Sequence, residues 1–192
     1  MTPKRQFIVF LLAVIGFVLL LMLLFGRSPA FRSNRSTQVK KEFTLTEYAQ
    51  RDSKVVAIID GPINGDDKHR AIRFTISRGT RLAEVVQGYE GTVIKRQSQP
   101  NNPNAYNDFM HALQKTGFGK ERKTAIKSEQ GICATGRRYV FEVYDNNDRI
   151  SRTWTAGCIK GNSMAEPSTV TNLFSAQITD YGKFTSGVWT DY

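Results

Sequence analysis

Residues 72–87, with the sequence IRFTISRGTRLAEVVQ, form the stretch that decides the fold. Apolar and polar residues alternate through its first half, with apolar side chains at Ile72, Phe74 and Ile76. That period of two is typical of a strand with one buried face. A turn is predicted at residues 78–79, and residues 81–87 return as the second arm of a hairpin.

Further strand-forming segments flank this hairpin. The apolar residues of Val55–Asp60 predict a first strand, which ends at Gly61-Pro62. Gly88 and Gly91 interrupt the chain after the hairpin, so we expect residues 92–95 to continue it past a bulge. The residues after position 26 include sixteen Thr, eleven Ile and ten Val but only four Leu, a bias that favours sheet.

A helix is predicted from Asn102, as its N-cap, to a stop at Gly117. Apolar residues at helical spacing mark one face, which we expect to pack against the sheet: Tyr106, Phe109, Met110 and Leu113. The Pro/Asn-rich residues 97–104 are predicted to be a loop between sheet and helix. A structural linker is one interpretation, and a binding surface at Pro100, Asn101 and Asn102 is the other.

The second half of the chain follows a similar plan. Alternation over residues 139–143, a turn at 145–148 and a return over 149–155 predict another hairpin. A second helix, capped by Ser168, is marked by Val170, Leu173, Phe174 and Ile178. Together the halves predict an α+β fold in a ββα–ββα layout, with an antiparallel four- to five-stranded sheet and two helices on one face.

The N-terminal part has a different composition. Phe7–Phe25 is a run of nineteen uncharged residues, about 28 Å long as a helix and enough to cross a bilayer core. We therefore predict a cytoplasmic tip and transmembrane signal anchor over residues 1–26, a basic flexible tether over 27–42 and an extracytoplasmic domain over 43–192. Cleavage after about Ala30 is the alternative.

The net charge of +10 is concentrated near this apolar run. Seven of the 27 basic residues precede residue 42, whereas residues 42–192 hold 20 basic and 17 acidic residues. This distribution favours contact with a membrane surface over nucleic-acid binding. Five basic residues after the run against two before it favour a cytoplasmic domain, but long domains translocate largely regardless of charge. We expect a single-pass plasma-membrane protein with its N-terminus in the cytoplasm.

Cys133 and Cys158 flank the second hairpin at nearly opposite positions. A disulfide there would clamp the open end of the hairpin, and such bonds persist outside the reducing cytosol. Two free buried thiols and a catalytic thiol are the alternatives.

The residues most often used in catalysis form no recognisable motif. Residues 66–69 make a polar segment that we interpret as a solvated turn containing His69. Asp108 and His111 share a helix face, but no further residues at metal-ligand spacing accompany them, and no nucleophile elbow is present. We therefore expect no catalytic residue, no metal and no cofactor.

Arg152 is in phase with Ile150 and Trp154, on the apolar face of its strand. At a sheet edge its stem can pack while its guanidinium reaches water. Alternatively, it anchors a carboxylate of the domain or of a partner, which makes it a possible binding residue.

The stretches GYEGTVIKRQSQPNN, AYNDFMHALQKTGF and GRRYVFEVYDNNDRISRTWTAGC resemble an uncharacterised family of single-pass exported proteins of Saccharibacteria-type bacteria. The resemblance covers roughly residues 85–181. It implies a cell-surface setting and supplies no catalytic residue.

These observations together predict a membrane-anchored, non-enzymatic domain with a binding or structural role at the cell envelope. Its expected partner is an envelope protein or glycan, and the oligomeric state is not predicted. A surface enzyme or a protease-inhibitor-like domain is the alternative.

Overall fold

The structure is a computed structural model that describes residues 12–21 and 43–189. The chain divides into two compact units, Met1–Lys41 and Glu42–Tyr192. In the first unit residues 12–21 are helical and exposed. The predicted tether, residues 27–42, lies outside the described residues.

The transmembrane part of the fold prediction needs correction. Within the described ranges, no helix combines the length and apolar character that a membrane crossing requires. The ten helical residues 12–21 span about 15 Å, half of a bilayer core. Residues 7–11 and 22–25 of the predicted span lie outside the described part of the chain.

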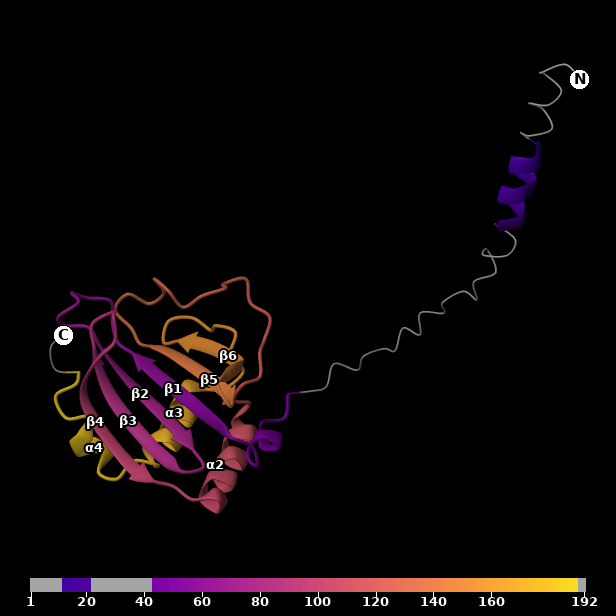
Figure 1. Ribbon diagram of the computed structural model, residues 1–192. Coiled ribbons are helices and arrows are strands. Elements are labelled where there is room, and N and C mark those ends of the chain that lie inside the picture. Colours follow the sequence, from indigo (N-terminus) through magenta and orange to yellow (C-terminus); the bar gives the residue numbers. More distant parts are fainter. Residues whose placement is uncertain (1–11, 22–42, 190–192) are drawn as a thin grey trace, which may run out of the picture. The chain divides into compact units, whose positions relative to one another are not determined.

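The second unit is an α+β domain (Figure 1). Its elements, in chain order, are η1 (Leu45–Tyr48), β1 (Ser53–Asp60), β2 (Arg70–Ser77), β3 (Thr80–Gln87), β4 (Thr92–Pro100), α2 (Pro103–Thr116), β5 (Arg138–Asp145), β6 (Asp148–Ala156), α3 (Pro167–Ser175) and α4 (Tyr181–Phe184).

The strands form one antiparallel sheet in the order β4-β3-β2-β1-β5-β6. The prediction of four or five strands in a ββα–ββα layout is therefore wrong, because six strands form and four of them precede α2. β4 also takes in residues 97–100, which were expected to be loop. As an edge strand it is exposed or half-exposed at every position, so it lacks the apolar period that identified β2.

All three α-helices lie on one face of the sheet (Figure 1). Their apolar residues pack on the side chains that β1, β2, β3 and β5 point toward that face. Phe174 of α3 lies at the centre of this core. Its ring centroid is 5.8 Å from that of Phe74 on β2, 5.1 Å from that of Phe109 on α2 and 5.8 Å from that of Phe118.

Residues at the ends of α2 and α3 explain where these helices begin and end. The predicted cap of α2 is confirmed, because the Asn102 side chain accepts a hydrogen bond of 2.9 Å from the Ala105 amide. Gly117 closes the same helix with a φ of 80°, a left-handed conformation that favours glycine. The predicted cap of α3 is wrong by two residues: Glu166 holds the cap position, because Pro167 has the fixed φ suited to a first helical residue.

Replacing Phe174 with alanine should destabilise the domain by about 3–5 kcal/mol, since it leaves a cavity where three aromatic rings meet. Urea denaturation of the full-length protein measures this loss. Met164→Ala, at a side chain that is 53% exposed, is the control and should cost little. Equal losses for the two variants would show that Phe174 is not central to the core.

Candidate functional site

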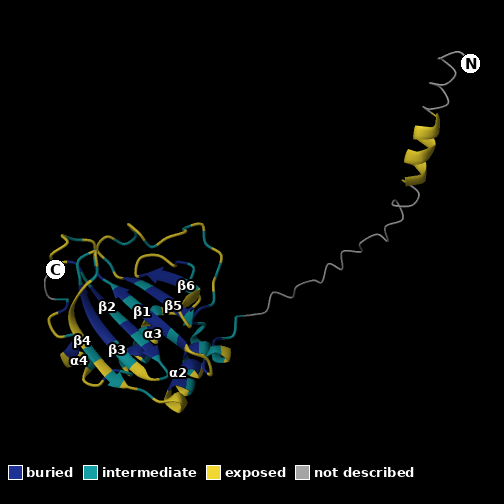
Figure 2. Cartoon of the chain, viewed as in Figure 1, coloured by how far each residue is buried: buried dark blue, intermediate teal, exposed yellow. Residues whose placement is uncertain are grey.

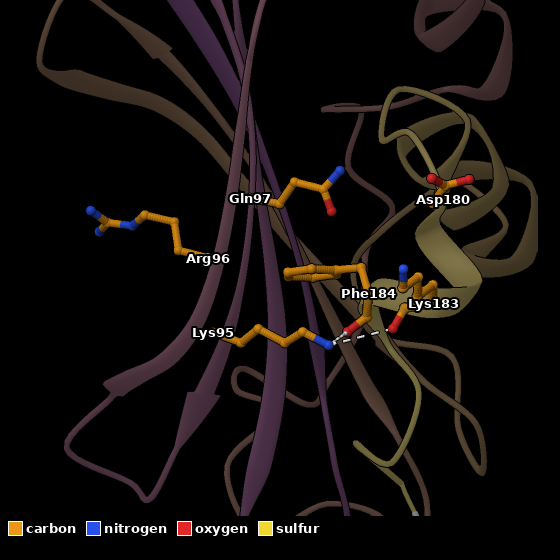
Figure 3. A pocket seen from close by; sticks show the side chains of 6 residues that line it. All are labelled: Lys95, Arg96, Gln97, Asp180, Lys183 and Phe184. Atoms are coloured by element: carbon orange, nitrogen blue, oxygen red, sulfur yellow. Dashed lines mark hydrogen bonds between the residues drawn. The ribbon is translucent and has the colours of Figure 1, made fainter.

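A shallow hollow of about 360 Å³ lies between the edge strand β4 and the short helix α4 (Figure 3). Six residues line it, of which three are basic and one is acidic: Lys95, Arg96, Gln97, Asp180, Lys183 and Phe184. Lys95 and Gln97 extend from β4 toward α4, whereas the Arg96 side chain extends to the opposite side of the strand.

Two side chains of β4 hold the C-terminal segment beneath the sheet. The Lys95 ammonium group donates hydrogen bonds to the backbone oxygens of Phe184, at 2.5 Å, and Lys183, at 3.4 Å. It also lies 5.2 Å from the centroid of the Phe184 ring. The side-chain amide of Gln97 donates a hydrogen bond of 2.8 Å to the backbone oxygen of Thr179. These contacts hold the C-terminal segment that lines the hollow to β4, and Lys183 is exposed at the rim of the hollow.

The helix-free face of the sheet carries an arginine–carboxylate–arginine ladder across β4, β3 and β2. Arg96, Glu84 and Arg73 occupy paired positions on these strands. One Glu84 oxygen accepts from the Nη2 of Arg96 at 2.6 Å, and the other from the Nη2 of Arg73 at 2.8 Å. Burial alone would raise the pKa of Glu84, but the two arginine hydrogen bonds outweigh it and hold the pKa below its usual value.

A second group of charges lies on the same face at β5 and β6. Glu142 accepts from Arg149 at 2.9 Å and lies 3.5 Å from the Nε of Arg152. Arg152 also pairs with Glu129, in the segment between α2 and β5. Burial would raise the pKa of Glu129, but the hydrogen bond from Arg152 lowers it below the usual value. Arg152 thus anchors carboxylates of its own domain.

A buried polar cluster at the end of β1 has no counterpart in the sequence analysis. His69 is 3% exposed, and its Nε2 lies 2.9 Å from an Asp60 oxygen. The other Asp60 oxygen accepts from Arg138 at 2.6 Å. The His69 ring stacks on Tyr89 with centroids 4.1 Å apart. His69 is therefore not part of a solvated turn, because tertiary contacts bury it.

Cys133 and Cys158 form a disulfide with their Cα atoms 5.8 Å apart. The bond joins the segment before β5 to the segment after β6. In that region Val140, Trp154 and Ala156 form a small second core on the helix-free face, against which Cys133, Ile126 and Ile132 pack. The disulfide thus fixes the loop that covers this end of the sheet.

The structure does not bring the predicted binding residues together. Arg152 is on β6, whereas Pro100 ends β4 and is followed by Asn101 and Asn102. These strands are the two opposite edges of the sheet. The three loop residues have structural contacts: Asn102 caps α2, the Asn101 amide group donates to the Ser77 oxygen at 2.6 Å, and the Pro100 oxygen accepts from Arg81 at 2.9 Å.

The candidate catalytic pair on α2 does not assemble either. Asp108 and His111 are both exposed, and the described part of the chain contains no hydrogen bond or ion pair between them. Nor do residues 12–21 and 43–189 contain a cluster of three or more His, Cys, Asp or Glu placed to hold a metal ion.

Comparison with known protein families and with curated proteins finds no match for this chain. The hollow is a candidate functional feature that the sequence analysis missed, and β4 beside it was predicted only over residues 92–95. The two adjacent basic residues of β4 were the only signal of the hollow in the sequence.

Replacing Glu84 with glutamine should lower stability at neutral pH by about 1–3 kcal/mol, because two arginines lose a charged partner. A carboxyl whose pKa is lowered by folding stabilises the protein above the unfolded-state value, near 4.3, and loses this contribution as the pH falls through the folded value. The unfolding free energy of Glu84→Gln should therefore depend less on pH below about 4.3.

Urea titrations between acidic and neutral pH test this prediction. Glu90→Gln, at an exposed position in the turn between β3 and β4, is the matched control and should keep the pH dependence of the unaltered protein. If Glu84→Gln showed that same dependence, Glu84 would not contribute to acid stability.

Proposed function

We propose that the folded domain is a non-enzymatic binding module that works outside the reducing cytoplasm, where its partner is a protein or glycan of the cell envelope. The disulfide between Cys133 and Cys158 is the single observation that carries the proposal. Structural disulfides persist in oxidising compartments and are rare in the cytosol.

The position of this bond supports a structural role for it. The described residues contain no free cysteine, so both thiols are used in one bridge. It closes a loop with a sequence separation of 25 and lies beside the small core around Trp154. A cytosolic form of the protein would lose this covalent link in a region that holds little other apolar packing.

The pairing of the buried carboxylates supports a role in binding more than one in catalysis. The partly or fully buried acids of the sheet each form at least one ion pair with an arginine: Asp60, Glu84, Glu142 and Asp145. A general acid or base needs a carboxyl that exchanges protons near the working pH. Carboxylates held by arginines in this way are part of the fold, and the pKa of Glu84 is held below its usual value.

Cys158→Ser should lower the unfolding free energy by about 2–4 kcal/mol, because the reduced loop gains entropy in the unfolded chain. Denaturation with and without a reducing agent measures the effect. The unaltered protein should lose stability on reduction, whereas Cys158→Ser should not respond. A reduced protein as stable as the oxidised one would contradict a structural role for the bond.

The compartment is tested by thiol labelling in cells. If the domain lies outside the cytoplasm, a maleimide reagent should fail to modify Cys133 and Cys158 until the protein is denatured and reduced. Direct labelling of both thiols after denaturation without reductant would place the domain in a reducing compartment and overturn the proposal.

The binding role is tested by affinity capture from envelope extracts with the full-length protein as bait. We expect specific enrichment of an envelope protein or glycan over an unrelated disulfide-containing bait of similar charge. Failure to enrich any component, combined with turnover of a hydrolase substrate, would replace the binding role with the enzymatic one.

A further inference from the structure

The two edge strands of the sheet, β4 and β6, differ in what covers their outer backbone groups. The segment after β6 covers that edge: the Trp154 amide donates to the Asn162 side chain at 2.7 Å, and the Ser163 amide to the Trp154 oxygen at 2.9 Å. β4 pairs with β3 alone, and over residues 43–189 no other backbone segment hydrogen-bonds to its outer edge. The β6 edge is therefore covered at its C-terminal end, from Trp154 to Ala156, whereas no described backbone segment covers β4.

The open edge is long enough to accept another strand. β4 has nine residues, about 30 Å of extended chain, and all are exposed or half-exposed (Figure 2). Its only irregularity is near the start, where Val86 pairs with Val93 and Val85 with Lys95, so that Ile94 is the extra residue of a bulge. From Lys95 to Pro100 the strand is regular. Proteins usually protect exposed edges of this length, so an open one is a candidate for strand addition.

Centred pairing of β4 with the β4 strand of a second copy is unfavourable. Arg96 is the central residue of β4, so antiparallel pairing of two such strands about their centres would place Arg96 opposite Arg96. Like charges directly opposite in a sheet are destabilising. Residues 27–41 do not fit either, because they contain five basic residues and no acidic one. Charge therefore disfavours these two occupants.

The charges around the edge favour an acidic partner. The Arg96 side chain extends away from the hollow and pairs with Glu84, so the basic groups at the hollow are Lys95 and Lys183. Asp180 is the single acid that lines the hollow. The Phe184 ring lies below these groups and is buried, with the Lys95 ammonium over it. A glutamate or aspartate side chain supplies a carboxylate for the two lysines.

We infer that β4 is a docking edge for an extended acidic peptide segment of a partner protein, which adds to the sheet as a seventh strand and places a carboxylate in the hollow. This inference rests on the proposed binding function and assigns the surface and the partner chemistry to it. Main-chain hydrogen bonds to β4 supply affinity, and the basic hollow supplies selectivity.

A displayed library of random ten-residue peptides, selected on the full-length protein, tests the partner chemistry. Selected sequences should be rich in Asp or Glu and in β-branched residues, with no proline in the middle. A selected peptide, made synthetically, is then titrated against isotopically labelled protein, and the amide signals of β4 should shift while those of β6 stay in place. Selection of basic sequences, no selection at all, or shifts confined to other elements would overturn the inference.

Lys183→Glu reverses a charge at the hollow, and Lys160→Glu makes the same change at an exposed position in the loop after β6. The first should weaken binding of the selected peptide by roughly tenfold and the second by less than about twofold. Lys183→Gln, which removes the charge without placing an acid at the C-terminal end of α4, should give an intermediate loss; matching thermal unfolding curves confirm that the variants are folded. Equal affinities for Lys183→Glu and Lys160→Glu would overturn the role of the hollow.

These outcomes separate the docking edge from the broader function. Suppose that an envelope partner is captured, that Lys183→Glu does not change its binding and that it does not shift the amide signals of β4. That result would support the binding module and contradict the docking edge. If labelling places the thiols in a reducing compartment while acidic peptides still bind β4, the docking edge is supported and the proposed compartment is contradicted.

Discussion

Phe174 packs its ring against Phe74, Phe109 and Phe118, and these contacts fix α3 to the sheet, to α2 and to the segment after α2. With the helices held to one face, the opposite face has to satisfy its polar groups without them. It does so with arginine–carboxylate pairs and with a loop held by the disulfide. The ion pairs are a consequence of one-sided packing, since a buried carboxylate without a partner is costly.

The same one-sided packing leads to the difference between the edges. The segment from β6 to α3 runs beside β6 and satisfies its outer backbone groups at Trp154 and Ala156. At the other edge, α4 lies under β4, and the contacts of Lys95 and Gln97 with the C-terminal segment come from side chains. Within residues 43–189 the backbone of β4 has no partner on its outer side, where it lies beside the hollow. That position supports the proposed binding role.

The sequence predicted the elements whose side chains have one buried face. The alternation in β2 identified a strand, and the apolar residues at helical spacing identified α2: Tyr106, Phe109, Met110 and Leu113. Both were readable because an element with one buried face has apolar residues at the spacing of that element. β4 was cut short and partly assigned to a loop, because an edge strand exposed on both faces has no such period. The burial of His69 and its pairing with Asp60 depend on contacts that spacing cannot show. The cysteine pair was identified because hairpin register limits which residues can meet.

Native-state amide hydrogen exchange of the full-length protein, without any ligand, tests most directly the claim that the β4 edge is open while the end of β6 is covered. Along β4 the account predicts alternation, with slow exchange for amides bonded to β3 and fast exchange for amides on the outer side. The amides of Trp154 and Ala156 should exchange slowly, because each has an acceptor in the segment after β6. Uniformly slow exchange along β4 would show that its edge is already covered and would contradict the account.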